Sequence, residues 1–94
     1  MNNAFDFWRS PKDINMEIAL RMRKKRKLNK LTQEQLGQKS GVSLGSVKRF
    51  ERTGEISLTS LVKIAFALDC EKDFDELFNQ KEYRSIQEVI DEQL

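Results

Sequence analysis

The amino-acid sequence predicts an all-α fold built around a single small core. Its 94 residues suffice for one domain but not for two independent cores. Apolar side chains repeat at spacings of three and four residues, and no stretch shows the two-residue alternation typical of a half-buried strand. Serine or threonine stands ahead of four of these apolar stretches, where a hydroxyl group can cap the first turn of a helix.

The first expected helix begins after Ser10. This serine is followed by Pro11, which suits the first helical position, and then by Asp13, an acid within the first turn. An apolar stripe with the spacing of one helical face runs along the helix, and it consists of Ile14, Ile18 and Met22. The cap, the proline and the stripe together predict a long helix, and its last turns carry a run of basic residues.

Two short helices are expected next. Thr32 and Gln35 form a capping-box pattern at the start of the first, and Gly41 can end it in a sharp turn that needs a positive φ. Ser43 then caps the second short helix, which Gly54 stops. Two short helices joined by a glycine-containing turn predict a helix-turn-helix arrangement.

The fourth expected helix, capped by Ser57, is apolar on most sides. We therefore expect it to be the central packing helix of the domain. Its polar residues leave only a narrow solvent-facing strip, which consists of Thr59, Ser60 and Lys63. A fifth, short helix is expected around residues 74–78, within a segment rich in acidic side chains.

The chain is expected to have three parts: an N-terminal arm at residues 1–12, a helical domain at 13–78 and a C-terminal tail at 79–94. The arm holds aromatic side chains that we expect to pack on the domain or on a second subunit. The tail ends in a short amphipathic segment that would be unstable alone. It can dock on its own domain, on a second subunit or on a different protein. We expect the arm or the tail to hold a dimer interface.

The charge is divided unevenly along the chain. The formal net charge is only +2, but residues 1–68 carry +8 and residues 69–94 carry −6. The segment at 21–52 holds 11 basic side chains and two acidic ones. Such a segment is typical of proteins that bind a polyanion, so nucleic acid is the expected partner. The alternative is an ordinary solvated helix face.

The sequence contains no histidine and a single cysteine, Cys70. Catalytic triads that need histidine and zinc sites built from histidine or cysteine clusters are therefore excluded. We expect no metal, no cofactor and no enzymatic activity, and we expect Cys70 to be a buried apolar residue. No apolar run approaches the roughly 20 residues of a membrane-spanning helix, and the first residues lack the features of a signal peptide. A cytoplasmic protein without a membrane partner is expected.

Four sequence elements follow one another between residues 31 and 68. They are Leu-Thr-Gln-Glu-Gln-Leu, Ser-Gly-Val-Ser, Val-Lys-Arg-Phe-Glu-Arg and Ser-Leu-x-x-Leu-x-Lys-Ile-Ala. In this order they resemble the Cro and lambda-repressor type of helix-turn-helix domain, also called the XRE family. The resemblance implies a five-helix lambda-repressor-like DNA-binding domain whose recognition helix, at about 43–52, lies in the major groove. The family usually has alanine where this chain has Gly37, which suggests a tighter helix crossing or a less stable helix.

The resemblance also implies which side chains meet DNA. Leu44 can touch a thymine methyl group, and Lys48 or Arg49 can reach guanine or a phosphate. Gly45 lets the backbone approach the bases closely. The full set of expected DNA-contacting residues is Gln33, Ser43, Leu44, Gly45, Ser46, Lys48 and Arg49.

Two of these residues have a structural alternative. Gln33 is expected to clasp a backbone phosphate at the start of its helix, but it can also be a solvated first-turn residue. Arg49 can contact a base or a phosphate, but it can also form a stabilising pair with Glu34 or Glu51.

The basic run that ends the first helix is expected to position the domain on DNA phosphates. Phosphate contacts of this kind add affinity without reading sequence. The residues expected in this role are Arg23, Lys24, Arg26, Lys27 and Lys30.

The expected function is that of a sequence-specific, double-stranded DNA-binding transcriptional regulator. We expect a dimeric repressor that reads an inverted repeat. The alternative is a HipB-like antitoxin that represses its own operon and binds a toxin protein through the arm or the tail. This alternative is based on the run from Ser43 to Leu58, which looks similar to regulators found beside HipA-type kinase toxins.

Overall fold

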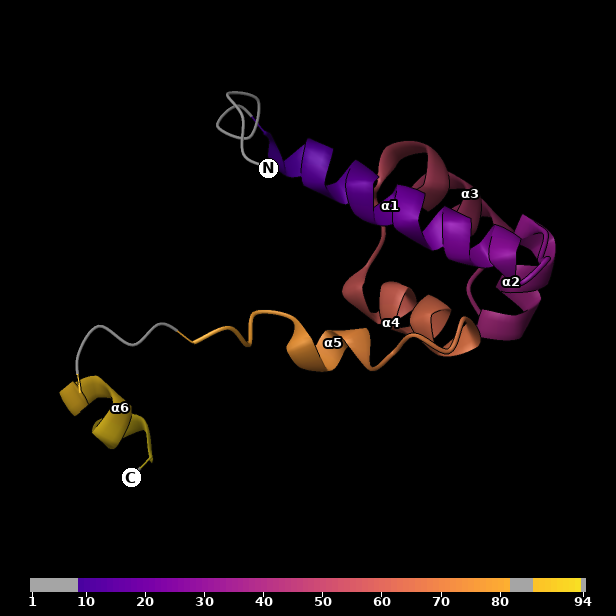
Figure 1. The fold of residues 1–94 in the computed structure, drawn as a ribbon. Coiled ribbons are helices and arrows are strands. Elements are labelled where there is room, and N and C mark those ends of the chain that lie inside the picture. The colour runs from indigo at the N-terminus through magenta and orange to yellow at the C-terminus, as the bar shows by residue number, and fades with distance from the viewer. Residues whose placement is uncertain (1–8, 82–85, 94) are drawn as a thin grey trace.

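The computed structural model of the protein describes residues 9–81 and 86–93. The described residues form helices and contain no strand (Figure 1). None of these helices is both long and apolar enough to span a membrane. The helices are α1 (Pro11–Leu28), α2 (Gln33–Ser40), α3 (Leu44–Thr53), α4 (Leu58–Ala67), α5 (Asp73–Glu76) and α6 (Ile86–Gln93).

The expected all-α fold is confirmed, with two adjustments. The fifth helix is a single turn, four residues long, and the amphipathic tail contributes α6 as a further helix. The first eight residues of the expected arm lie outside the described residues. The proposed division into arm, domain and tail therefore stays a prediction.

The helix starts follow the expected capping patterns. The backbone N–H of Asp13 donates to Oγ of Ser10 at 3.1 Å, and the N–H of Ser10 donates to the Asp13 carboxylate at 2.9 Å. Gln35 and Thr32 make the same reciprocal bonds at 3.0 and 2.9 Å. Each pair provides acceptors for two backbone N–H groups that would lack a partner at the start of the helix. The other two expected hydroxyl caps are also present, and they are Ser43 and Ser57.

Glycines let the helices of this domain approach one another closely. Gly41 and Gly54 end α2 and α3 with φ angles of 76° and 80°, as expected for left-handed helix ends. A side chain at Gly54 would lie 2.8 Å from the backbone of Asn15, so the end of α3 rests directly on α1. A β-carbon at Gly37 would lie 2.9 Å from the carbonyl oxygen of Val42. Gly37 therefore lets α2 lie directly against the turn that follows it, while a tighter helix crossing or a less stable helix stays a prediction.

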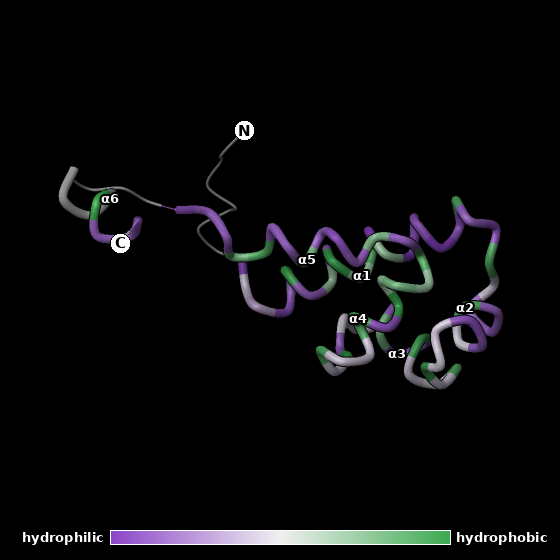
Figure 2. Tube along the Cα trace, turned by 90° about the horizontal axis from the view of Figure 1, so that it is seen from below, coloured by the Kyte–Doolittle hydropathy of each residue, from purple (hydrophilic) through white to green (hydrophobic). Residues whose placement is uncertain are grey.

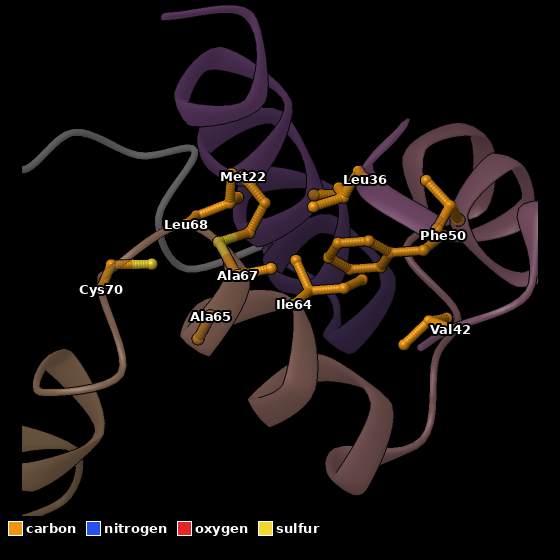
Figure 3. Close-up of a cluster of buried hydrophobic side chains, with 11 residues drawn as sticks. Met22, Leu36, Val42, Phe50, Ile64, Ala65, Ala67, Leu68 and Cys70 are labelled. Atoms are coloured by element: carbon orange, nitrogen blue, oxygen red, sulfur yellow. The ribbon is translucent and has the colours of Figure 1, made fainter. Parts of the chain in front are cut away.

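The core lies where α1, α2, α3 and α4 meet. Helix α3 packs on α1 and α2, and α2 also packs on α4. Figure 3 shows the Phe50 ring of α3 pointing toward Ile64 of α4. Cys70 is 9% exposed, which confirms its expected burial. The largest fully buried side chains are Phe50, Leu36, Ile64 and Val47.

The structure corrects the expectation that α4 is covered on most sides. Ile64 and Ala65 are completely buried, but Leu58 is 68% exposed and Phe66 is 61% exposed. The helix turns one apolar side to the core and a second one to solvent, because no described element packs over that second side. The apolar residues of α4 therefore form two surfaces. One packs in the core of this chain, and the other is open to solvent.

Helix α6 stands clear of the bundle in both views (Figures 1 and 2). The connection runs from α5 through residues 79–81, which are exposed. Ile90 of α6 is 44% exposed. The tail is expected to dock on an apolar surface, and Ile90 does not make such a contact within its own chain.

Replacing Phe50 by alanine should unfold much of the population. Phe50 is 2% exposed, and removing a buried phenylalanine side chain costs about 3–5 kcal/mol, a large part of the stability of a small domain. Urea denaturation followed by circular dichroism measures the change. Phe78→Ala is the matched control, because Phe78 is 94% exposed and its loss should change the free energy of unfolding by less than about 0.5 kcal/mol. Equal midpoints for the two variants would contradict this description of the core.

Candidate nucleic-acid interface

One buried carboxylate joins α3 to the two helices that precede it. Glu51 of α3 is 8% exposed. Arg26 of α1 donates to both of its carboxylate oxygens, through Nε at 2.7 Å and Nη2 at 2.9 Å. Gln33, the first residue of α2, donates from Nε2 to the same carboxylate at 3.1 Å. The three bonds fix α3 relative to α1 and α2.

The surroundings of Glu51 favour its charged form. Burial alone would raise its pKa, but the hydrogen bonds from Arg26 and Gln33 and the nearby positive charges outweigh that effect. The pKa of Glu51 therefore lies below its ordinary value. The nearest further charge is that of Arg23, whose Nε lies 4.0 Å from the carboxylate. The group is accordingly ionised at neutral pH and holds its partners by charge-assisted bonds.

The structure corrects the role expected for Arg26. Its residue exposure is only 7%, and besides the two bonds to Glu51 it donates from Nη1 to the carbonyl oxygen of Leu31 at 2.7 Å. A guanidinium group held in this way inside the domain is not available to a DNA phosphate. Arg26 is thus a structural residue, and the sequence did not distinguish it from its basic neighbours because all of them lie in one charged run.

Gln33 has a side-chain partner that neither of its two expected roles included. It is the first residue of α2, and it is half-buried because its side chain is bonded to Glu51. A solvated, unattached first-turn side chain is therefore ruled out. The start of a helix, where Gln33 lies, is also a setting for an anion contact because its first backbone N–H groups lack intrahelical partners. Contact of Gln33 with a phosphate stays a prediction.

Helix α3 separates into an inner and an outer face, as its periodicity indicated. Val47 is fully buried, Phe50 is 2% exposed and Glu51 faces its buried partners. The opposite face is open to solvent. The exposed residues on it and at its start include all those expected to meet DNA on this helix: Ser43, Leu44, Gly45, Ser46, Lys48 and Arg49.

The first turn of α3 is shaped by small residues. Ser43 accepts a hydrogen bond from the backbone N–H of Ser46 at 3.1 Å and donates to its hydroxyl oxygen at 2.9 Å. A β-carbon built on Gly45 would have no atom within 4 Å. The absence of a side chain there is not required by packing within the described chain. It leaves the backbone of α3 open to close approach by a partner.

The structure gives Arg49 a partner that the sequence interpretation did not name. Its Nε and Nη2 donate to one carboxylate oxygen of Glu55 at 3.1 and 2.9 Å. The pairs considered for Arg49, with Glu34 or Glu51, are not formed, and the stabilising bridge uses Arg26 instead. Both side chains of the Arg49–Glu55 pair are more than half exposed, so the pair contributes little stability.

Glu55 was missed because it lies beyond the end of the helix. It follows Gly54, and helical periodicity does not extend through a left-handed turn to show where the next side chain points. A shallow hollow opens beside this pair, between α3 and the start of α4. It is lined by Ser46, Arg49, Glu55, Ile56, Ser57 and Ser60.

The other basic residues expected to contact phosphates are exposed, but they do not all lie near α3. Arg23 lies beside Glu51 and hence beside α2 and α3. Lys24, Lys27 and Lys30 are exposed and have no ion-pair partner within the described part of the chain. Their contact with phosphates stays a prediction. The described residues hold no group of three or more histidine, cysteine, aspartate or glutamate side chains placed to bind a metal ion.

These features define a helix-turn-helix DNA-binding domain: a short supporting helix, a left-handed turn at glycine, and a second helix with a buried face and an open, polar face. A comparison with protein families gives the same class. The family model described as helix-turn-helix matches residues 22–74, which is more than half of the chain. The chain belongs to this family, and it is an XRE-type DNA-binding transcription regulator. No match was found among curated proteins or among solved structures.

Replacing Glu51 by glutamine should destabilise the domain and change its response to acid. Leaving Arg26 buried without its counter-charge is expected to cost about 3–5 kcal/mol. Because the folded-state pKa of Glu51 is lowered, its contribution is complete above the unfolded-state pKa of about 4.3. The contribution is lost as the pH falls toward the lower, folded-state pKa. Carboxyl groups titrate between about pH 3 and 7. Over this range the melting temperature should therefore depend less on pH in the variant than in the wild-type chain.

Glu55→Gln is the matched control for this experiment. It makes the same change in the exposed pair, so it should alter stability by less than about 1 kcal/mol and leave the acid response in place. A Glu51→Gln protein as stable as Glu55→Gln would show that the buried bridge does not hold α3.

Proposed function

We propose that the protein is a dimeric repressor that binds an inverted repeat in double-stranded DNA through α3 and has no catalytic activity. The observation that carries the proposal is the division of α3. Its inner face is fixed by Val47, Phe50 and the Glu51 bridge, while its outer face presents polar, basic and small residues to solvent. A rigid helix with such a free face is what major-groove reading requires.

The outer face of α3 suits specific base contacts. Arg49 and Lys48 carry donors for guanine O6 and N7, and Leu44, 37% exposed, offers an apolar surface for a thymine methyl group. Glu55 pairs with the guanidinium of Arg49 at the side of α3, and because this pair is exposed, Arg49 can exchange it for a base or phosphate contact at little cost.

Phosphate contacts are proposed for the residues at the α2 start and on the exposed side of α1. Gln33 is oriented by Glu51, and Arg23 lies beside it, so both can meet one DNA strand flanking the site read by α3. The lysines of the basic run add sequence-independent attraction. The acidic segment after residue 68 repels DNA and favours approach by the basic part of the chain.

Two subunits are proposed to read two half-sites. Helix-turn-helix domains of this kind bind half-sites about one helical turn apart, so an inverted repeat in DNA matches a two-fold protein dimer. Dimer formation also supplies buried surface that a chain of this size lacks by itself.

DNA binding is tested by selecting duplexes from a random pool and measuring their affinity by fluorescence anisotropy. Lys48→Ala and Arg49→Ala should each weaken binding to the selected duplex by about 10-fold or more while the melting temperature changes little, because both side chains are exposed. Lys81→Ala removes one positive charge away from α3 and should weaken binding far less. Affinity that does not exceed that for random DNA would refute the proposal. Affinity should also fall steeply as salt rises.

Gly45→Ala separates DNA contact from folding. The new methyl group meets no atom of the described chain, and alanine favours a helix over glycine by up to roughly 1 kcal/mol, so the melting temperature should stay the same or rise. Affinity for the selected duplex should nevertheless fall, because the methyl group would occupy the space left for the bases. Unchanged affinity would show that DNA does not approach α3 at Gly45.

A second candidate function is that of a HipB-like antitoxin. The observation that favours a protein partner is the exposed apolar side of α4, where Leu58 and Phe66 are mostly uncovered and lie on an element other than α2 or α3. A toxin bound there would leave the DNA-reading helix free. An adjacent toxin-like reading frame whose product co-purifies with this chain would support the candidate, and loss of that complex in Phe66→Ser would place the contact on α4. Without such a reading frame the antitoxin role fails.

A further inference from the structure

An apolar groove lies between α1, α4 and the segment that contains α5. Its cavity measures about 240 Å³ and is open to solvent on one side. Its walls are mostly apolar, and the side chains that form them include Ile18 and Met22 of α1, Leu61 and Ala65 of α4, and Phe74 and Leu77 from the α5 segment. The groove is separate from the DNA-reading face, because no residue of α2 or α3 lines it.

The rim of the groove is basic on its α1 side. Arg21 and Lys25 lie one turn apart on α1 and both line the groove. Neither is in an ion pair with a described residue. The opposite side carries Asp73 at the start of α5. An occupant with an apolar stripe and acidic flanks would match the walls and the α1 rim together.

The tail of this chain has that pattern. Helix α6 has apolar residues at positions 86, 89 and 90, which is the spacing of one helical face. Its charged residues are all acidic, Glu88, Asp91 and Glu92. With eight residues it is too short to be stable without a packing partner. The tail therefore needs an apolar surface, and the groove offers one with a basic rim on its α1 side.

We propose that α6 of one subunit occupies the groove between α1, α4 and α5 of a second copy, in a reciprocal exchange that forms the dimer. Chain length permits the exchange, because the residues between Leu77 and α6 can span about 30 Å when extended. The path of the chain favours a second copy over the same one, since α6 stands clear of its own groove in both views. Two such contacts related by a two-fold axis form a closed, isologous dimer. This inference rests on the proposed function, which includes a dimer, and it identifies the surface through which the two subunits bind.

The exchange is tested without DNA by light scattering on the full chain. Ile90→Glu should convert a dimer into a monomer by placing a charge in the apolar stripe, and the monomer should stay folded because Ile90 does not support the core. Gln87→Glu adds the same charge at a position of α6 that helical spacing places outside the stripe of positions 86, 89 and 90, and it should leave the dimer intact. A dimer that survives Ile90→Glu would overturn the proposal.

Cys70 reports whether the groove itself is covered. It lines the groove and is the one cysteine of the chain, so its rate of reaction with a thiol reagent measures access. The rate should rise at least 10-fold in Ile90→Glu, relative to the wild-type chain at the same pH. A monomer whose Cys70 reacts no faster would place α6 on another surface. A wild-type monomer whose Cys70 reacts at least 10-fold more slowly than that of Ile90→Glu would show that each chain covers its own groove. Either result would overturn the exchange.

Charge reversal tests the basic rim. Lys25→Glu should weaken the dimer at least 10-fold, and Glu92→Lys, which lies beside the stripe on α6, should restore it in the same chain, whereas Lys12→Glu, on the first turn of α1 away from the groove, should have little effect. Failure of the second substitution to restore the dimer would overturn the proposed pairing of the acidic residues of α6 with the basic rim. None of these measurements uses DNA. The two proposals can therefore fail separately. A result against the α6 exchange does not contradict DNA binding, and a result against DNA binding does not contradict the exchange.

Discussion

The structure depends most on the buried carboxylate of Glu51. It accepts hydrogen bonds from α1 through Arg26 and from α2 through Gln33, while it belongs to α3. Removing a carboxylate and a guanidinium from water costs several kcal/mol per ion, by order of magnitude, so each keeps its place only while the other is present. This mutual requirement makes one arrangement of the three helices much more favourable than its neighbours, and it orients the helix that reads DNA.

Two arginine–glutamate pairs with different roles meet on α3. The Arg26–Glu51 pair is almost fully buried and fixes the domain, whereas the Arg49–Glu55 pair lies in solvent on the outer side of α3. The difference arises from surroundings and not from residue type, since both pairs have similar distances. Buried ions must be paired, but an exposed arginine can exchange its carboxylate partner for a phosphate or a base at little cost.

The uneven charge of the chain matches the two partners that we propose for it, DNA and a second subunit. The DNA-reading face and the basic run belong to the positive part, and the acidic tail belongs to the negative part. The basic α1 rim of the apolar groove complements α6 and lies apart from α2 and α3. In the proposed arrangement the dimer groove lies apart from α3, so the dimer contact and the contact of α3 with DNA can be made at once. The exposed apolar side of α4 leaves a further surface for a protein partner.

The sequence by itself determined the helices, their caps and their glycine ends, because these depend on residues within one or two turns, such as Thr32 with Gln35. It also determined the two faces of α3, because helical periodicity separates Val47 and Phe50 from Lys48 and Arg49. Only the tertiary structure decided which arginine pairs with Glu51, since Arg26 lies 25 residues away in a run of similar cations. It likewise decided which apolar side of α4 is buried. Local spacing predicts a face, but the packing of distant helices decides what covers it.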